Sequence, residues 1–144
     1  MGLGGHGEGS GISAALFFAR SGARVFVTDM KKEEELKHQL KKLNKFKNIR
    51  YFFGGHRKKD FQKADLIFQN PSVPDSSPYL NIARENRIPI INDWSLFLDY
   101  CNNFLIGITG SKGKSTTTSL VYDFLKKKNR AILCGNIGVS PLKY

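Results

Sequence analysis

The chain has 144 residues, of which 40% are hydrophobic, 12% aromatic and 24% charged, and this composition is typical of a folded globular protein rather than a disordered one. No uninterrupted apolar run is long enough to cross a bilayer, and the first residues lack the basic and then apolar pattern of a signal peptide. We therefore expect a soluble cytoplasmic protein with a proper hydrophobic core.

The formal net charge is +11, and most of the lysines gather in residues 37–47, 56–59 and 126–128. The first and third groups are interleaved with leucine or phenylalanine at helical spacing, which is typical of a solvated helix face. No nucleic-acid-binding motif accompanies them, so we predict neither a nucleic-acid nor a membrane partner. Cys101 and Cys134 fit no metal-ligand spacing and are expected to be buried free thiols.

In chain order, residues 12–20 have apolar side chains at helical spacing, and residues 24–28 form a buried strand that ends at Asp29. The next helix has glutamates in its first turn, which suits the helix dipole, and a stripe of leucines toward the core. The glutamates and leucines of this helix are Glu33, Glu34, Glu35, Leu36, Leu40 and Leu43. Residues 49–53 are expected to form the second strand.

The second half of the chain continues the alternation of strands and helices. The expected strands cover residues 66–69, 89–91, 104–109 and 131–133. The expected helices cover residues 79–86, 94–100 and 114–128, and Asp93 is expected to cap the middle one. The pattern predicts an α/β fold with a Rossmann-like, mainly parallel sheet and helices on both faces.

A polar break at Cys101, Asn102 and Asn103 is the predicted domain boundary, with residues 1–102 forming one α/β domain. Residues 103–144 supply only two expected strands and one helix, the first βαβ piece of a P-loop ATPase domain. Such a piece buries one side of its sheet only, so we expect the remainder of that domain to be absent.

The segment LIGITGSKGKSTTTSLVYDFL has the order strand, glycine-rich loop and helix that a phosphate-binding loop requires. Lys114 is placed to reach the β- and γ-phosphates of ATP, and the Ser115 hydroxyl to ligate Mg²⁺. Lys112 either adds charge to the nucleotide site or points into solvent. The predicted ATP-binding residues are Gly110, Ser111, Lys112, Gly113, Lys114, Ser115 and Thr116.

A second glycine-rich turn at the start of the chain, GLGGHG, matches the G-x-G-x-x-G pattern of dinucleotide-binding folds. Asp29 follows at the end of a strand, where such folds place the acidic residue that receives ribose hydroxyls. The strand that should precede the turn is missing from the sequence. His6 either touches a diphosphate or is a bystander in the loop.

A glycine-rich α/β domain followed by GITGSKGKSTTT and GNIG resembles the Mur ligases. The stretches GARVFVTD, GGHRKKDFQKADLIFQNPSVP and SPYLNIARENRIPIINDWSLF are most similar to the D-glutamate-adding members, and the L-alanine-adding members are the alternative. The resemblance covers the whole chain, which corresponds to about the first third of such an enzyme. The family commonly has asparagine where Lys112 stands.

The resemblance implies an ATP- and Mg²⁺-dependent ligase of peptidoglycan-precursor synthesis. It implies phosphorylation of the carboxylate of UDP-N-acetylmuramoyl-L-alanine, attack by the D-glutamate amine on the acyl phosphate, and a monomer at full length. Lys114 and Asn136 are the implied catalytic residues, with Asn136 contacting the muramoyl group and Ser115 holding the metal. The implied substrate-binding residues are Gly4, Gly5, His6, Asp29, Asn70, Pro71, Ser72 and Asn136.

The family's further catalytic residues and its amino-acid-binding domain would follow Tyr144, so we expect the chain alone to be inactive as a ligase. Two other classes of function remain open from the residues. An NAD-dependent dehydrogenase would use the first glycine-rich turn but leaves the phosphate loop unexplained. A non-catalytic nucleotide- or nucleic-acid-binding module would use the lysine clusters.

Overall fold

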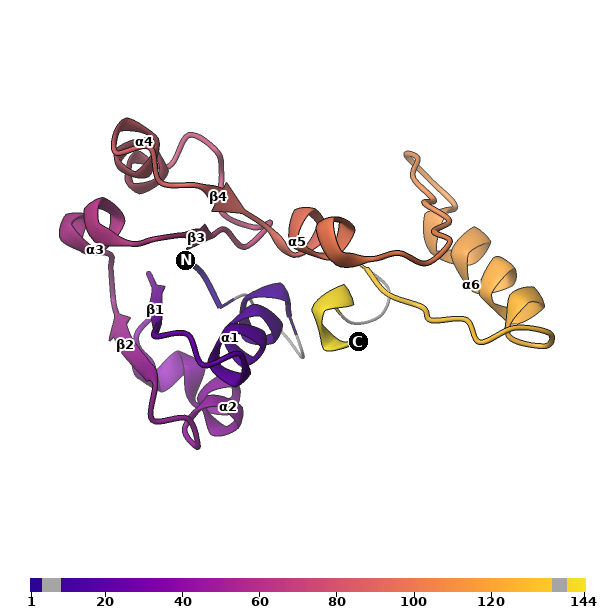
Figure 1. Ribbon diagram of the computed structural model, residues 1–144, viewed down its shortest axis with the longest axis horizontal. Helices are drawn as coiled ribbons and strands as arrows, with labels where there is room; N and C mark the ends of the chain where they lie inside the picture. The colour runs from indigo at the N-terminus through magenta and orange to yellow at the C-terminus, as the bar shows by residue number, and fades with distance from the viewer. Residues whose placement is uncertain (4–8, 136–139) are drawn as a thin grey trace.

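The computed structural model describes residues 1–3, 9–135 and 140–144, and in them helices and short strands alternate along the chain (Figure 1). None of the helices within those ranges is both long and apolar enough to span a membrane. In chain order the elements are α1 (Ser10–Arg20), β1 (Val25–Asp29), α2 (Glu33–Leu43), β2 (Ile49–Phe53), α3 (Lys58–Lys63), β3 (Ile67–Phe68), α4 (Pro78–Glu85), β4 (Ile90–Ile91), α5 (Asp93–Tyr100), α6 (Lys114–Leu125) and the 3-10 helix η1 (Pro141–Lys143).

The strand pairing is parallel throughout the described residues, as the alternating pattern predicts. β1 pairs with β2 in a register that sets Val25 opposite Ile49, and β3 pairs with β4 with Ile67 opposite Ile90. The predicted parallel direction of the strands is confirmed. The strands form two separate two-stranded sheets, however, and not the single sheet that the pattern predicts.

Residues 1–3 lie between the two sheets and connect them (Figure 1). The amino group of Met1 donates to the carbonyl of Phe68 at 2.7 Å, and the amide of Asn70 donates to the carbonyl of Met1 at 3.1 Å. On the other side, the amide of Gly2 donates to the carbonyl of Thr28 at 2.9 Å. These three residues thus lie where the last residues of a strand between β1 and β3 would lie.

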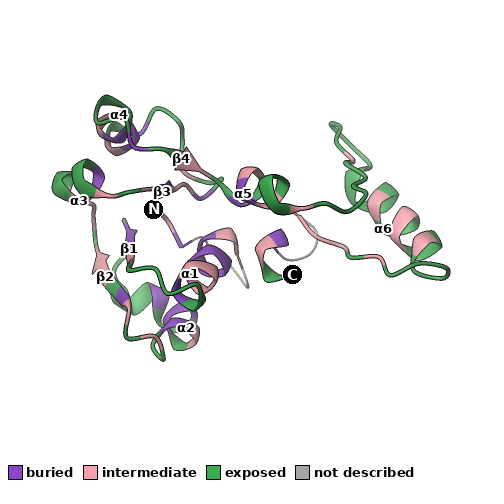
Figure 2. Ribbon diagram, in the orientation of Figure 1, coloured by how far each residue is buried: buried purple, intermediate pink, exposed green. Residues whose placement is uncertain are grey.

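Two hydrophobic clusters form the core, one on each side of this connection (Figure 2). The first joins α1 and α2 to β1 and β2, and it contains the leucine stripe predicted for α2. The second joins α3 and α4 to β3 and β4. Leu3 belongs to the first cluster and Met1 packs against the second, so apolar burial as well as hydrogen bonds ties the two halves together.

Two local features differ from the sequence predictions. The cap of α5 is Asn92 rather than Asp93: its side-chain oxygen accepts from the amides of Trp94 and Ser95, both at 2.9 Å, and Asp93 is the first residue of the helix. Helix α3 was not predicted, because the charge cluster at residues 56–59 hides its start. Its one buried side chain is Phe61.

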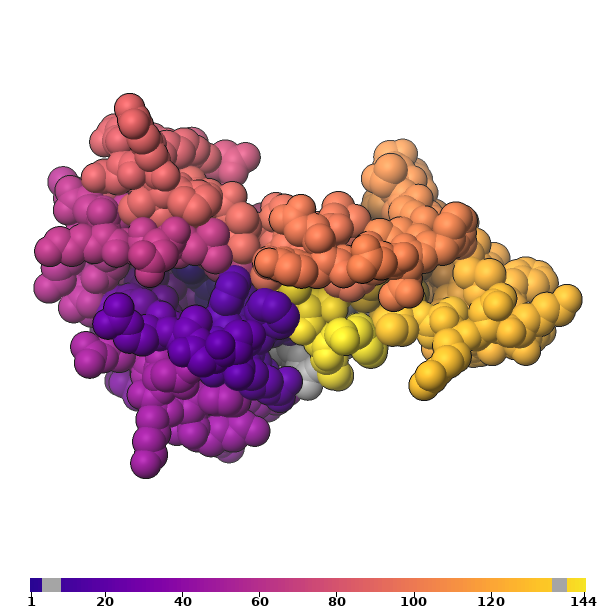
Figure 3. All heavy atoms as spheres, in the orientation of Figure 1, coloured from indigo at the N-terminus to yellow at the C-terminus, as the bar shows by residue number. Residues whose placement is uncertain are grey.

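Residues 103–133 form an arm that extends away from the two cores (Figure 3). The helix predicted after residue 114 is confirmed as α6, but it has no buried residue. The strands predicted at residues 104–109 and 131–133 are wrong: the structure shows no regular strand there, and Phe104 is 91% exposed. A strand forms only against a partner, and no described segment covers this one.

After the arm the chain returns to the first half of the molecule. Pro141 is buried, and η1 lies against α1 and α5. Cys101 and Cys134, predicted to be buried thiols, are free but only half-buried. Burial raises the pKa of the Cys134 thiol. The last residues thus pack against the first half of the molecule.

Candidate functional site

Asp29 ends β1 and shapes the turn beside it. Its carboxylate accepts from the backbone amide of Leu3 at 2.7 Å and from that of Lys31 at 2.9 Å, one bond on each oxygen. The side chain is 8% exposed. A buried carboxylate is stable where amide donors replace its water. Asp29 therefore holds Leu3, at the start of the glycine-rich turn. It does so as a buried side chain and not as an exposed carboxylate of the kind that receives ribose hydroxyls.

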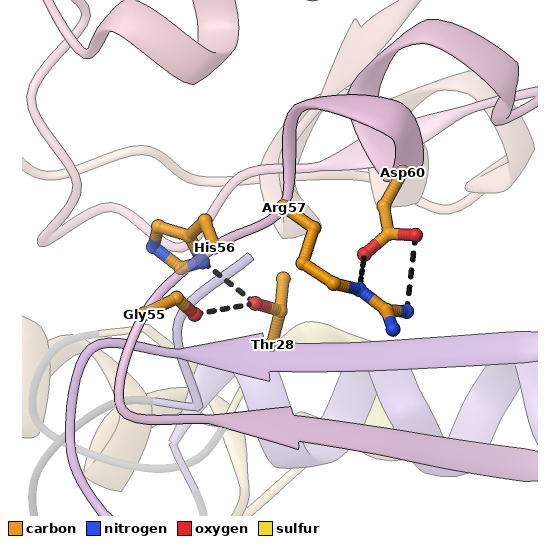
Figure 4. Close-up of polar contacts among 5 residues, drawn as sticks. All are labelled: Thr28, Gly55, His56, Arg57 and Asp60. Carbon is orange, nitrogen blue, oxygen red and sulfur yellow. Dashed lines mark hydrogen bonds and ion pairs between the residues drawn. The ribbon is translucent and has the colours of Figure 1, made fainter.

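Thr28 and His56 meet at the same end of the sheet (Figure 4). The Thr28 hydroxyl lies 2.6 Å from Nδ1 of His56 and 3.0 Å from the carbonyl of Gly55, to which it donates. The imidazole packs edge-on against the rings of Phe61 and Tyr79. Burial lowers the pKa of His56, the positive N-terminus lowers it further, and Asp29 opposes the shift. The lowered pKa favours the neutral imidazole, in which one ring nitrogen donates a hydrogen bond and the other accepts one.

Arg57 follows His56 and is already partnered. Its guanidinium makes two bonds to the carboxylate of Asp60, at 2.8 and 3.1 Å (Figure 4). It also lies over the rings of Phe26 and Phe52, 4.8 and 4.7 Å from their centroids. These contacts hold α3 against β1 and β2. The positive charge is thereby kept beside the carboxyl ends of the strands, although Asp60 neutralises part of it.

The turn after β3 is built around Asn70. The Asn70 side-chain oxygen accepts from both the amide and the hydroxyl of Ser72, at 3.0 and 2.8 Å, an Asx turn that leaves Pro71 and Ser72 exposed. Gly2 brings this turn next to β1. It has φ of +75°, and a Cβ there would lie 3.1 Å from Val73 and 3.3 Å from the Asn70 side chain. Only glycine fits this approach without strain.

The structure therefore gathers several of the predicted substrate-binding residues at one edge. The carboxyl ends of β1 and β3 carry Asp29 and Asn70, and residues 1–3 connect them. Ligands of open α/β sheets bind at such an edge, where strand order reverses. The predictions for Gly4, Gly5, His6 and Asn136 lie outside the described residues.

The predicted phosphate loop is at the start of α6. Gly113 precedes the helix with φ of +76°, and Gly110 has φ of +149°, so both occupy conformations that favour glycine. The Lys114 ammonium donates back to the carbonyls of Gly110 and Ser111. The helix N-terminus, its exposed amides and this ammonium have the charge and donors that a polyphosphate needs, so the residues present fit ATP.

The same loop offers one hydroxyl for a metal. Ser115 is exposed, and so are Ser111, Lys112 and Thr116. Among the residues that the structure describes, no three His, Cys, Asp or Glu side chains gather where they could hold a metal ion. A Mg²⁺ ion here would take Ser115 and otherwise oxygen ligands from the phosphates and water, which is how Mg²⁺ is commonly bound.

The two predicted sites are not brought together. Figure 1 shows α6 and its loop at one end of the molecule, with β1 to β4 at the other. Sequence reasoning missed the Thr28 and His56 pair and read His56 as part of a charge cluster. The position of His56, directly after a strand and two glycines, was the signal that could have identified it.

Comparison with known proteins supplies a family and several relatives. The model of the family "Mur ligase MurD-like, N-terminal domain" matches residues 1–92. The chain is 44% identical over its whole length to the UDP-N-acetylmuramoylalanine–D-glutamate ligase of Borreliella afzelii. It is 41% identical, also over its whole length, to the ligase of the same name from Treponema pallidum, and 39% identical over 99% of its length to that of Roseiflexus.

The matched relatives are much longer than this chain. It spans 31% of the Borreliella afzelii protein, 27% of the Treponema pallidum protein and 30% of the Roseiflexus protein. Among solved structures, a pseudomurein peptide ligase type C from Methanothermus fervidus superposes with a TM-score of 0.50 and 29% identity, over 81% of this chain and 24% of that one.

Proposed function

The chain belongs to the family of MurD-like Mur ligases, and from this premise we propose that it binds the UDP end of a muramoyl substrate and begins the ATP-binding domain of a ligase. The activity we infer for the whole protein is ATP-dependent addition of D-glutamate to UDP-N-acetylmuramoyl-L-alanine. The observation that carries the proposal is the 44% identity to a ligase of that name over the whole chain.

We divide the chain between these roles at the boundary that the sequence predicts. Residues 1–102 contain both hydrophobic clusters and would form the UDP-binding domain, whereas residues 103–144 would begin the ATP-binding domain. The exposed arm supports this division, since α6 buries no side chain of its own in the described residues. A helix of this kind gains stability only when further elements cover it.

In the UDP-binding part, the residues act mainly through the backbone. Asp29 fixes Leu3 and so aims the glycine-rich turn, in which Gly4, Gly5 and His6 would approach the diphosphate. The turn at Asn70, with Pro71 and Ser72 exposed beside it, would lie along the nucleotide. The backbone amides of such turns bind phosphates without clashing side chains.

In the ATP-binding part, Lys114 would leave the loop carbonyls and neutralise the β- and γ-phosphates, while Ser115 would hold Mg²⁺ with Thr116 beside it. ATP supplies the phosphoryl group that activates the substrate carboxylate for attack by the amine of D-glutamate. The chain contributes position and positive charge to that step, which dominate catalysis of phosphoryl transfer. Asn136 would orient the muramoyl group, and Lys112 adds charge at the rim of the loop.

Calorimetric titration tests the substrate half of this proposal. We expect the chain to bind UDP-N-acetylmuramoyl-L-alanine, and UDP more weakly, with no comparable binding of NADH. Preferential binding of NADH would overturn the proposal in favour of a dehydrogenase. Salt-sensitive DNA binding without UDP-sugar binding would favour a nucleic-acid module instead.

A chimera tests the activity. Residues 1–144 would replace the matching segment of the Borreliella afzelii relative, whose remaining length supplies the other domains. We expect ATP-dependent incorporation of D-glutamate by the chimera and none by the chain alone. A well-folded chimera that accepts UDP-N-acetylmuramate but not UDP-N-acetylmuramoyl-L-alanine would assign the chain to the other branch of the family, because the UDP-substrate half is the part that residues 1–144 contribute.

A further inference from the structure

Thr28, Gly55 and His56 form a short chain of polar contacts at the carboxyl ends of β1 and β2 (Figure 4). The Thr28 hydroxyl oxygen lies 3.0 Å from the carbonyl oxygen of Gly55 and 2.6 Å from Nδ1 of His56. A hydroxyl has one proton to donate, whereas a carbonyl oxygen only accepts. The proton of Thr28 can therefore serve only one of its two neighbours.

The Gly55 carbonyl decides where that proton lies. If the hydroxyl donated to His56, two oxygens would face each other at 3.0 Å with no proton between them, and the carbonyl would lose the hydroxyl as a donor. If the hydroxyl donates to Gly55, its oxygen accepts the proton that Nδ1 carries, and both contacts are hydrogen bonds. The second arrangement is the favourable one, and it assigns the ring proton of the neutral imidazole to Nδ1.

Nε2 of His56 is then an acceptor with an open lone pair. Among the described residues no hydrogen bond to Nε2 is found, and this nitrogen is not one of the buried polar atoms that lack a partner, so a ligand can reach it. The ring packs edge-on against Phe61 and Tyr79, with centroid distances of 5.7 and 4.9 Å. These contacts and the bond to Thr28 hold the acceptor in one direction.

The order of the elements along the sheet edge indicates which part of the proposed substrate meets His56. The glycine-rich turn proposed for the diphosphate follows Leu3, which Asp29 holds between the two sheets. β4 leads into α5 and then into the arm with the phosphate loop, so the muramoyl carboxylate has to extend past β3 and β4 to reach ATP (Figure 1). The uridine, at the other end of the diphosphate, is then left on the side of β1 and β2, where His56 lies.

The uracil base matches the acceptor that His56 presents. N3 of uracil carries a proton and donates a hydrogen bond, whereas N3 of cytosine carries none and accepts. The two bases have the same ring and nearly the same size, so packing alone separates them poorly. A fixed acceptor stabilises the first base and leaves two lone pairs facing each other with the second.

We propose that His56 is a specificity-determining residue, which accepts a hydrogen bond from N3–H of uracil at Nε2, and that Thr28 is a positioning residue, which fixes the tautomer of His56. The inference rests on the function proposed above, because it concerns the UDP end of the same substrate. It adds a chemical criterion to that function: the nucleotide must have a base with a ring N–H donor.

The unaltered 144-residue chain tests the base preference. Calorimetric titration compares UDP-N-acetylmuramoyl-L-alanine, UDP, CDP and UDP that is methylated at N3 of the base. Methylation removes the N3 proton and keeps the ring. We expect CDP and N3-methyl-UDP to bind about tenfold more weakly than UDP, because both lack the donor that Nε2 accepts.

Three variants test the assignment to His56. His56→Phe keeps a ring against Phe61 and Tyr79 but removes both nitrogens, and we expect it to bind UDP about tenfold more weakly and UDP and CDP within about twofold of each other. Thr28→Val removes the hydroxyl and keeps a similar shape, and we expect the same loss of preference although Nε2 remains. His38→Phe, at an exposed position of α2, is the matched control and should keep the full preference.

Nitrogen NMR of the imidazole separates base recognition from packing. Long-range correlations between ring protons and ring nitrogens identify the tautomer. We expect the Nδ1–H form in the unaltered chain, with an Nε2 resonance that shifts on addition of UDP and not on addition of N3-methyl-UDP. In Thr28→Val we expect the proton to move to Nε2, because Nδ1 loses its acceptor.

Three results would overturn the inference and leave the proposed function intact. The first is binding of UDP-N-acetylmuramoyl-L-alanine together with equal affinities for UDP, CDP and N3-methyl-UDP. The second is an Nε2–H tautomer in the unaltered chain, and the third is full preference for UDP in His56→Phe. Failure of every uridine nucleotide to bind would instead overturn both the function and the inference. The nucleotide series and the tautomer are measured on the unaltered chain, so misfolding of a variant does not affect them.

Discussion

The carboxylate of Asp29 accepts a hydrogen bond from the backbone amide of Leu3, 26 residues earlier in the chain, at 2.7 Å. This bond joins the end of β1 to the start of the glycine-rich turn. It gives the acidic residue of the nucleotide-binding pattern a structural task that the pattern alone does not reveal: the residue holds Leu3, at the start of that turn.

Replacing Asp29 with asparagine is expected to lower the free energy of unfolding by about 1–3 kcal/mol, because one buried backbone donor loses a charged acceptor. UDP-sugar binding is expected to weaken in parallel, since the turn loses its anchor. Urea unfolding and calorimetric titration measure the two effects. Asp99→Asn, at an exposed position of α5, is the matched control. Weaker UDP binding with unchanged stability would instead show direct contact between Asp29 and the ligand.

The Met1 amino group makes stability depend on pH. Burial lowers its pKa from 8.0 to about 6, so between these values the unfolded chain binds a proton that the folded chain does not. Stability is therefore greatest above pH 8 and falls as the pH falls toward 6, by about 2–3 kcal/mol in total.

Urea unfolding between pH 7 and 8.5, above the titration of His56, measures the slope due to Met1. N-terminal acetylation is the control, because the acetylated amide keeps a donor for Phe68 but no longer titrates. We expect the acetylated chain to show a flat profile in this range. An equal slope in both forms would assign the effect to another group.

Lys114→Ala is expected to weaken binding of Mg²⁺-ATP by about tenfold, because the loop loses the ammonium proposed to neutralise the β- and γ-phosphates. Its side chain is exposed, so stability should change by less than about 0.5 kcal/mol. A fluorescent ATP analogue provides the measurement. Lys128→Ala, an exposed lysine after the same helix, should bind ATP normally, and an equal loss in both variants would indicate a general charge effect.

The arm and the core should respond differently to the same substitution. Leu40→Ala removes a side chain that is 5% exposed in the first cluster, and should cost about 2–5 kcal/mol. Leu120→Ala removes a side chain of α6 that is 55% exposed, and should cost less than about 0.5 kcal/mol. Chemical denaturation compares the two. A large cost at Leu120 would show that α6 packs against the rest of the chain in solution.

The Asn92 cap should contribute measurably to the stability of α5. Asn92→Ala removes the acceptor of two backbone amides and is expected to cost about 1 kcal/mol, whereas Asn92→Ser retains a capping oxygen and most of that stability. Thermal unfolding followed by circular dichroism distinguishes the two variants. Equal stability of all three proteins would mean that α5 is frayed at its start.

The sequence by itself determined the elements whose patterns are local. The spacing of Leu36, Leu40 and Leu43 predicted α2, the β-branched run before Asp29 predicted β1, and the glycines before Lys114 placed the start of α6. The stretch that ends at Asp29 and the glycine-rich loop before Lys114 were also among the segments that resemble the Mur ligases, and the family match confirms the resemblance over residues 1–92. Periodicity and turn chemistry are properties of neighbouring residues, so they can be read without a fold.

Only the tertiary structure decided what depends on distant partners. The strands expected at residues 104–109 and 131–133 do not form, because a strand needs hydrogen bonds to a neighbouring strand and the described part of the chain places none beside them. The pairing of Thr28 with His56 and the bond from Leu3 to Asp29 join residues far apart in the chain. No local pattern contains these pairings, because they depend on how the two hydrophobic clusters pack on either side of residues 1–3.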